Sequence, residues 1–264
     1  MKQVKISLVL ILILCLCSTQ LIFASSSVQR AATDTIRVLT IGNSFADNAS
    51  QYLLEITQSV EGFHIVIGSA NIGGSSLDKH ADYIKKNEQD STFKPYRGKS
   101  LKDMLLQEKW DVVTIQQVSH MSYKSETYQP YADEIVDFVN TYSPDAKIYI
   151  HQTWAYAPDC ERLEGFGITS DQMYKGLKKN YKTLAKHYNS PILKSGDAFI
   201  HASKAYNIDL WTAEDRFHAN SNGEYLAGCV WFSELFNVSA KKIQFVPEGM
   251  SNETAALLRN AASK

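Results

Sequence analysis

The sequence is poor in the features that mark several classes of protein. Only 4 of its 264 residues are cysteines, which excludes a scaffold held together by disulfide bonds. The 27 basic and 28 acidic residues nearly cancel and form no strongly basic stretch, so we expect no nucleic-acid partner. The histidines lack metal-ligand spacing. The hydrophobic share of 44% is ordinary and argues against a disordered chain.

A long hydrophobic run occurs only at the start of the chain. Lys2 and Lys5 precede the apolar run 6–17, which is short for a membrane span of about 20 residues. A basic start, a short apolar core and the small residues after it predict a secretory signal peptide at 1–24, in preference to a retained anchor. A flexible leader is expected at 25–34. The mature protein should be secreted or held in the cell envelope, without stable membrane insertion after cleavage.

Two cysteines remain after that cleavage. Cys160 and Cys229 could pair in an oxidising compartment, and they could equally be two buried free thiols. The sequence leaves both interpretations open.

Short apolar runs alternate with helical patterns through 35–264. The runs at 36–41, 65–67, 112–115, 148–150 and 191–193 are typical of strands, and helices are expected over 135–142, 173–184, 221–236 and 254–262. Strands that are apolar almost throughout are typical of a parallel sheet covered on both faces. We therefore expect one domain, a three-layer α/β/α sandwich around a parallel sheet of about five strands. Binding sites in such sheets lie at the carboxyl ends of the strands.

The first strand is followed by the sequence Gly-Asn-Ser-Phe at 42–45. Gly42 allows a sharp turn, which places Ser44 between strand and helix, near the positive end of that helix. Such a serine could be a nucleophile, and it could also simply cap a helix that starts near 46–48.

Groups that can stabilise an oxyanion come after the next two strands. Gly73 and Gly74 would let backbone N–H groups approach a ligand closely, as an oxyanion hole requires. Gln116 and Gln117 end the third strand, and a glutamine amide donates a hydrogen bond without carrying charge. Each feature alone is also compatible with an ordinary loop or strand end.

A possible acid–base pair stands late in the chain. Asp215 precedes His218 by three residues, so its carboxylate can accept the Nδ1 proton and leave Nε2 free as a base. The residues 221–224 have the form of a capping box, and a helix should start there.

Together these elements resemble the SGNH (GDSL-like) hydrolase superfamily, which has a flavodoxin-like three-layer fold. More specifically, the chain resembles a branch of that superfamily with a Gly-Asn-Ser-Phe first block, matched at 42–45. The further blocks of that branch match 73–77, 110–117 and 151–156. The resemblance covers nearly all of the mature chain.

The resemblance implies a Ser-His-Asp triad. Ser44 matches the nucleophile, His218 the general base and Asp215 the acid that orients it. The backbone N–H groups of Ser44 and of Gly73 or Gly74 match two oxyanion donors.

The third oxyanion donor of many members is an asparagine in a Gly-x-Asn-Asp block, which this chain lacks. Gln116 takes its place in the branch pattern, although Gln117 could be the residue that faces the site. Arg216 stands where glycine is usual before the base, and this departure leaves open a weakened, carbohydrate-binding protein as the alternative to an enzyme.

The expected activity is that of a secreted serine esterase that removes small acyl groups, acetyl above all, from a carbohydrate. The partner is then a small-molecule or glycan ester, and no cofactor or metal is needed. Ser119, Gln117, Trp154 and Tyr156 could line the substrate site, while core packing explains the two aromatic residues equally well. A flavodoxin-like cofactor binder is disfavoured, because Asp47 would repel a phosphate.

Overall fold

The computed structural model describes residues 34–263, so the predicted signal peptide lies outside the described residues. Five parallel strands form one sheet in the order β2-β1-β3-β4-β5. Their bounds are β1 (Asp34–Gly42), β2 (Phe63–Asn71), β3 (Val112–Ile115), β4 (Lys147–His151) and β5 (Ile192–Leu193). The predicted α/β fold and all five predicted strands are confirmed. Asp34, expected as the last leader residue, already belongs to β1.

The register of the strands brings their ends to a common edge. Ile41 pairs with Ile115, and Gly42 pairs with Asn71, so β1, β2 and β3 finish side by side. All four residues of β3 are buried, which explains its unbroken apolar sequence. The segments that leave these three strands therefore meet at one edge of the sheet, where the sequence predicts the site.

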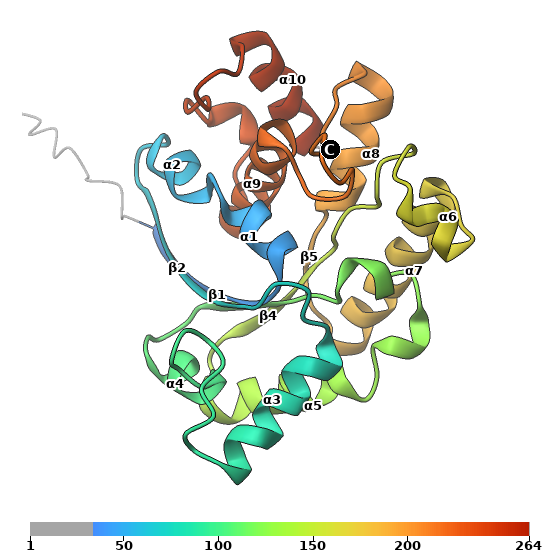
Figure 1. Cartoon of the computed structure of the whole chain (residues 1–264). Helices are drawn as coiled ribbons and strands as arrows, with labels where there is room; N and C mark the ends of the chain where they lie inside the picture. Colours follow the sequence, from blue (N-terminus) through green and yellow to red (C-terminus); the bar gives the residue numbers. More distant parts are fainter. Residues whose placement is uncertain (1–33, 264) are drawn as a thin grey trace, which may run out of the picture. The chain divides into compact units, whose positions relative to one another are not determined.

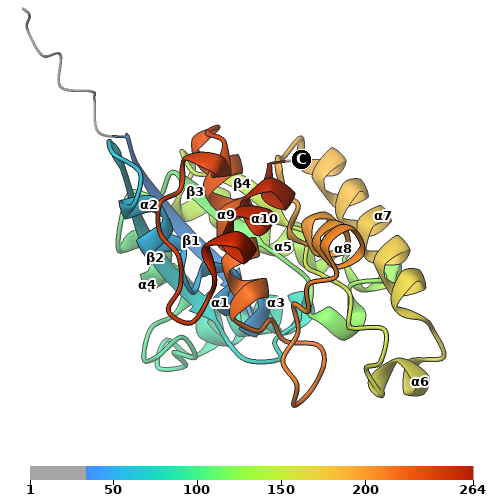
Figure 2. The same ribbon diagram turned by 90° about the horizontal axis from the view of Figure 1, so that it is seen from above.

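Helices cover both faces of the sheet (Figure 1). One face carries α1 (Ser44–Ser50), α2 (Leu53–Gln58), α8 (Ser195–Tyr206), α9 (Ser221–Phe236) and α10 (Asn252–Ala262). The other face carries α3 (Leu77–Gln89), α4 (Leu101–Leu106) and α5 (Tyr131–Tyr142). The long α7 (Ser170–Tyr188) packs against β4 and β5, and the short α6 (Arg162–Phe166) lies beyond the carboxyl ends of the strands (Figure 2).

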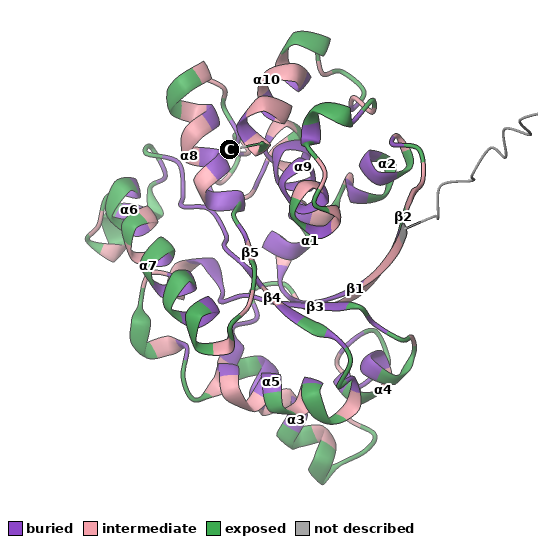
Figure 3. Ribbon diagram, turned by 180° about the vertical axis from the view of Figure 1, so that it is seen from behind, coloured by how far each residue is buried: buried purple, intermediate pink, exposed green. Residues whose placement is uncertain are grey.

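The helix α9 forms the centre of the first helical layer. It is apolar on nearly all sides and is enclosed by α1, α2, α8 and α10, so most of its residues are buried (Figure 3). A Cβ on Gly228 would lie 2.7 Å from Cδ1 of Ile56, which shows how closely α9 and α2 approach. This packing joins the carboxyl-terminal part of the chain firmly to the layer that begins at Ser44.

Two helices begin with a different cap from the expected one. Ser44 is not the cap of α1: the side chain of Asn43 accepts the Phe45 N–H, and Ser44 is the first helical residue. At α9, Asn220 caps the helix instead of Ser221. In both cases an asparagine one residue earlier takes the role, since its amide oxygen reaches the free N–H groups of the first turn.

Two remaining questions from the sequence concern the thiols and the membrane. Cys160 and Cys229 are both buried and free, so they do not form a disulfide in this structure. No helix in residues 34–263 combines the length and the apolar character needed to cross a membrane.

Candidate active site

The structure brings together three side chains that the sequence places far apart. Oγ of Ser44 lies 2.8 Å from Nε2 of His218. Nδ1 of the same imidazole lies 2.5 Å from Oδ2 of Asp215. A carboxylate can only accept this hydrogen bond, so Nδ1 carries the proton and the lone pair of Nε2 faces the Ser44 hydroxyl.

The carboxylate of Asp215 is held by a set of donors on its other oxygen. Oδ1 accepts hydrogen bonds from the Thr212 hydroxyl at 2.7 Å and from the backbone N–H groups of Phe217 and His218 at 2.9 and 3.0 Å. Burial by itself would raise the pKa of Asp215, but these hydrogen bonds hold that pKa well below its usual range. Asp215 is therefore an anion with a fixed orientation behind His218.

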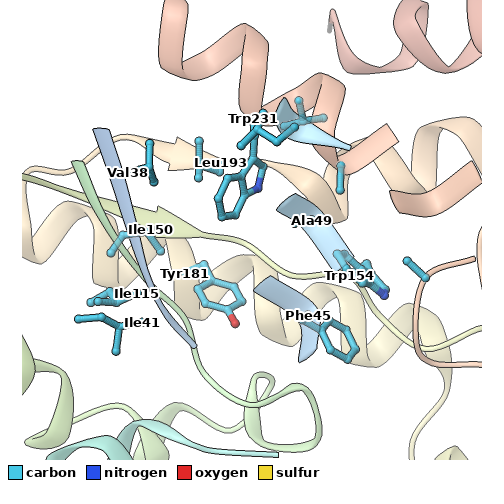
Figure 4. Packing of buried hydrophobic residues seen from close by; sticks show 14 of the residues in the cluster. Val38, Ile41, Phe45, Ala49, Ile115, Ile150, Trp154, Tyr181, Leu193 and Trp231 are labelled. Carbon is cyan, nitrogen blue, oxygen red and sulfur yellow. The ribbon is translucent and has the colours of Figure 1, made fainter. Parts of the chain in front are cut away.

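The backbone around Ser44 is fixed by its two neighbours. Asn43 caps α1 and also donates from Nδ2 to the carbonyl oxygen of Ser75 at 2.9 Å, which ties the turn after β1 to the loop after β2. Phe45 is buried and its ring stacks on Trp154 at a centroid separation of 4.5 Å (Figure 4). Ser44 thus stands half-exposed on a rigid turn.

A cavity of about 410 Å³ opens above Ser44. It is lined by residues from the turns after β1 to β4 and from the loop that carries His218, namely Asn43, Ser44, Phe45, Gly73, Gly74, Val118, Ser119, His120, Tyr156, Arg162, Phe217 and His218. An ester that enters this cavity can therefore meet the Ser44 hydroxyl and the imidazole together.

The loop after β2 that contains Gly73 and Gly74 lines the cavity and has free backbone donors. Gly74 has φ +67°, a conformation that favours glycine, and a Cβ on Gly73 or Gly74 would meet no atom within 4 Å. Within residues 34–263, the backbone N–H groups of Ser44, Gly73 and Gly74 donate to no protein acceptor. These are the groups from which an oxyanion hole is built.

The expectation for Gln116 does not hold. Its side chain is 1% exposed and does not line the cavity. Nε2 donates to Oδ1 of Asn43 at 2.9 Å, and Oε1 receives a 2.5 Å hydrogen bond from Nδ1 of His151. Gln116 therefore lies beneath the turn that carries Ser44 and supports it, because Asn43 occupies the space between the amide and the cavity.

Two of the four expected substrate-lining residues lie at the cavity, and two do not. Ser119 and Tyr156 line it, and their hydroxyl groups lie 2.9 Å apart. Gln117 does not line it: its Nε2 donates to the Thr127 carbonyl, and its Oε1 accepts from the backbone N–H groups of Leu77 and Val118. Trp154 is fully buried and belongs to the core.

Trp154→Ala is expected to destabilise the protein by about 3–5 kcal/mol, the usual cost of removing a large aromatic side chain from a core. The indole stacks on Phe45 and on Phe199, each at 4.5 Å, and its Nε1 donates to the carbonyl of Phe217. Unfolding in urea measures the change, with Trp154→Phe as the milder control. A variant with unchanged unfolding but a greatly increased KM would instead make Trp154 a substrate contact.

Sequence reasoning missed the buried network that supports the site. His80 bridges Gly42 and Tyr96: Nε2 lies 2.9 Å from the Gly42 carbonyl and Nδ1 lies 2.8 Å from the Tyr96 hydroxyl. Burial lowers the pKa of His80 to about 4 and that of His151 to about 3, so both imidazoles are neutral. The sequence shows only that His80 follows the Gly73–Gly74 loop and that His151 ends β4. Neither position predicts which residues these side chains contact.

Arg216 does not enter the cavity. Its backbone has φ +57°, which explains why glycine suits this position, and its side chain pairs with Asp159 at 2.9 Å and Asp209 at 2.8 Å. The residue therefore fastens the loop that carries Asp215 and His218 from outside. In residues 34–263 no group of three or more His, Cys, Asp or Glu side chains is arranged to hold a metal ion.

Solved structures with this fold include one from the same family. A DUF4886 family protein from Bacteroides uniformis is 29% identical, with a TM-score of 0.79 over 87% of this chain and 94% of that one. A candidate SGNH hydrolase from Slackia heliotrinireducens is 22% identical, with a TM-score of 0.58 over 76% and 100% of the two chains. An acetyl xylan esterase is 15% identical, with a TM-score of 0.50 over 75% and 99%. The fold is thus that of the SGNH hydrolases.

No curated protein matches the sequence. One family model does, over residues 37–264, and its description is a domain of unknown function, DUF4886. The match includes strands β2 to β5, all but the first three residues of β1, and all three residues of the Ser44–His218–Asp215 arrangement. The chain belongs to the DUF4886 family.

Proposed function

We propose that this protein is a serine esterase in which Ser44 is the nucleophile, His218 the general base and Asp215 the acid that orients it. The observation that carries the proposal is the pair of hydrogen bonds from Ser44 through His218 to Asp215 at the wall of an open cavity. A serine hydroxyl is a weak nucleophile, and a neutral imidazole at 2.8 Å is the base that activates it.

In the first step Nε2 of His218 takes the hydroxyl proton while Oγ of Ser44 attacks the ester carbonyl. The imidazolium that results is stabilised by the Asp215 carboxylate. It then protonates the leaving alcohol, and an acyl group remains on Ser44. In the second step His218 takes a proton from water, the hydroxide attacks the acyl group, and the carboxylic acid leaves as Ser44 is restored.

The negative oxygen of each tetrahedral intermediate needs hydrogen-bond donors that are already in place. The backbone N–H groups of Ser44, Gly73 and Gly74 border the cavity without a protein acceptor among residues 34–263, which supports this role for them. Gln116 does not donate to the oxyanion in this proposal. Its hydrogen bond to Asn43 positions the turn that carries Ser44. One such donor typically contributes a factor of about 10²–10³ in turnover.

The substrate we propose is a small acyl ester, in particular an acetyl ester of a carbohydrate, and the protein acts on it after export. The amino-terminal signal peptide expected from the sequence supports export. An acetyl xylan esterase shares the fold, which supports an acetyl group on a sugar. The cavity of about 410 Å³ has polar side chains such as Ser119 and His120 among its lining residues, which favours a short acyl chain over a long apolar one.

The test combines covalent labelling with product release. A fluorophosphonate probe should label the wild type and not Ser44→Ala, and acetate should appear from at least one of a panel of acetylated glycans. Absence of labelling together with measurable glycan binding would favour a carbohydrate-binding protein. Labelling with turnover of longer acyl esters only would keep the esterase and reject the acetyl group.

A further inference from the structure

The cavity above Ser44 contains one permanently charged group. Among its lining residues Arg162 carries a full charge, and no aspartate or glutamate of residues 34–263 lines it. The guanidinium carbon lies 4.2 Å from the centroid of the Phe217 ring, and that ring lies 4.3 Å from the His218 imidazole. The Phe217 ring therefore lies between the guanidinium and the imidazole of the proposed base, and a cation–π contact holds the positive charge in place.

This charge is not neutralised by the protein. Within residues 34–263 Arg162 forms no ion pair, although Glu161 precedes it and Glu164 follows two residues later. Its side chain contacts the Tyr156 hydroxyl, which is uncharged. The nearby Asp159 is already paired with Arg216. A guanidinium that lines a cavity without a carboxylate partner can offer its planar pair of donors to a ligand.

Two lysines that do not line the cavity, Lys79 and Lys124, lie near one of its lining residues, His120. His120 also lines the cavity, and its pKa is lowered first by burial and then by the positive charges of Lys124, Arg162 and Lys79. These three cations therefore lie near enough to act on one imidazole at the cavity wall. Their combined potential would attract an anion and raise its local concentration.

The structure assigns to Arg162 the binding of a carboxylate on the substrate, so the preferred substrates are esters that carry a carboxylate near the scissile bond. This inference rests on the proposed esterase function and adds the class of substrate. The carboxylate can belong to the alcohol, as in an acetylated uronic acid, or to the acyl group, as in a hemisuccinate. In both cases the fork of the guanidinium matches the two carboxylate oxygens.

The experiment measures kcat/KM on two matched pairs of esters. One pair is the acetylated methyl glycosides of galacturonic acid and galactose, and the other is mono-p-nitrophenyl succinate and p-nitrophenyl butyrate. We expect the wild type to prefer the anionic member of at least one pair. Arg162→Gln should lose about 10- to 100-fold on that anionic ester, the range for a charge-assisted hydrogen bond, and change the neutral ester little. The pair that responds identifies which part of the ester carries the carboxylate.

Two controls separate the charge from its position. Arg162→Lys keeps the charge and loses the fork, so it should fall between the wild type and Arg162→Gln. Arg37→Gln removes an arginine at the opposite end of β1, where it pairs with Glu108, and should leave both ratios unchanged. Added salt should reduce the wild-type preference, since it screens charges that are near the surface.

The outcomes distinguish this inference from the function on which it rests. A wild type that hydrolyses the neutral esters through Ser44 and shows no preference for either anionic ester overturns the role of Arg162 alone. Equal losses on neutral and anionic esters in Arg162→Gln would also overturn it, because Arg162 would then support the site as a whole. A wild type that takes no fluorophosphonate label at Ser44 and hydrolyses none of the four esters would overturn both proposals. A wild type that is labelled at Ser44 and hydrolyses none of them would overturn the role of Arg162 and keep Ser44 as the nucleophile.

Discussion

Replacement of Ser44 by alanine is expected to lower kcat toward an activated acetyl ester by about 10⁴- to 10⁶-fold, as in other hydrolases that lose a serine nucleophile. Without Oγ no acyl group can be bound covalently, while the oxyanion donors and His218 remain for a slow attack by water. The fold should be unaffected, because Asn43 and not Ser44 caps α1. Steady-state rates and unfolding in urea together measure the two effects.

A second serine on the same helix provides the matched control. Ser50 lies at the end of α1, and its hydroxyl donates to the carbonyl of Ala46 at 2.9 Å, away from His218. Ser50→Ala should therefore keep the wild-type kcat. If Ser44→Ala retained a tenth of that rate or more, with equal purity and folding, another group would have to be the nucleophile.

The positions of Ser44, Gly74 and His218 were predictable for two reasons. Parallel strands deliver the loops at their carboxyl ends to a single edge, so the order of the apolar runs already placed the first two near each other. The third depended on recognising Asp215 three residues before an imidazole, a local pattern that a single turn of chain can satisfy. Sequence order and local geometry marked these residues as candidates, and the resemblance to the SGNH hydrolases assigned them to one triad.

The role of Gln116 could not be predicted from sequence order and local geometry. Its place after β3 is a local fact, but its hydrogen bonds run to Asn43 and His151, which lie at the ends of two other strands. A side chain in such a position can point into the cavity or beneath it, and only the packing between strands decides. Here Asn43 lies between Gln116 and the cavity, so the Gln116 amide supports the turn that carries Ser44.

For Arg216, the sequence suggested a disturbance of the site that the structure does not show. A bulky residue in place of glycine suggested a disturbed site, because the sequence does not reveal where the side chain goes. The structure turns it outward onto Asp159 and Asp209, and a left-handed residue other than glycine costs only about 1–2 kcal/mol. Arg216 and the missing Gly-x-Asn-Asp block suggested a weakened site, yet Oγ of Ser44 still lies 2.8 Å from Nε2 of His218.

Asp215→Asn is expected to lower kcat by about 10⁴-fold, the loss seen when the triad acid is replaced by its amide. The reason lies in the donors around the carboxylate. Three of them converge on Oδ1, from Thr212, Phe217 and His218, so the oxygen of an asparagine would be held there. Its NH₂ group would then face Nδ1 of His218, which must become the acceptor. The proton moves to Nε2, and the imidazole can no longer take a proton from Ser44.

Asp209→Asn is the matched control for this substitution. Asp209 is a carboxylate that pairs with Arg216 behind the same loop and does not touch His218. Its amide variant should keep kcat within about threefold of the wild type, as expected for the loss of an exposed ion pair. A comparable loss in both variants would mean that the loop, and not the tautomer of His218, carries the effect.

The same carboxylate also makes stability depend on pH, with a definite sign. The pKa of Asp215 is lower in the folded protein than in the unfolded chain, where an aspartate has a pKa of about 3.9. Its contribution to the free energy of unfolding is therefore complete above that value and is lost as the pH falls toward the folded pKa. Asp215→Asn has no such contribution at any pH. The difference in unfolding free energy between wild type and Asp215→Asn should therefore shrink as the pH falls below about 4. A difference that did not shrink there would mean that the hydrogen bonds to Oδ1 do not stabilise the anion.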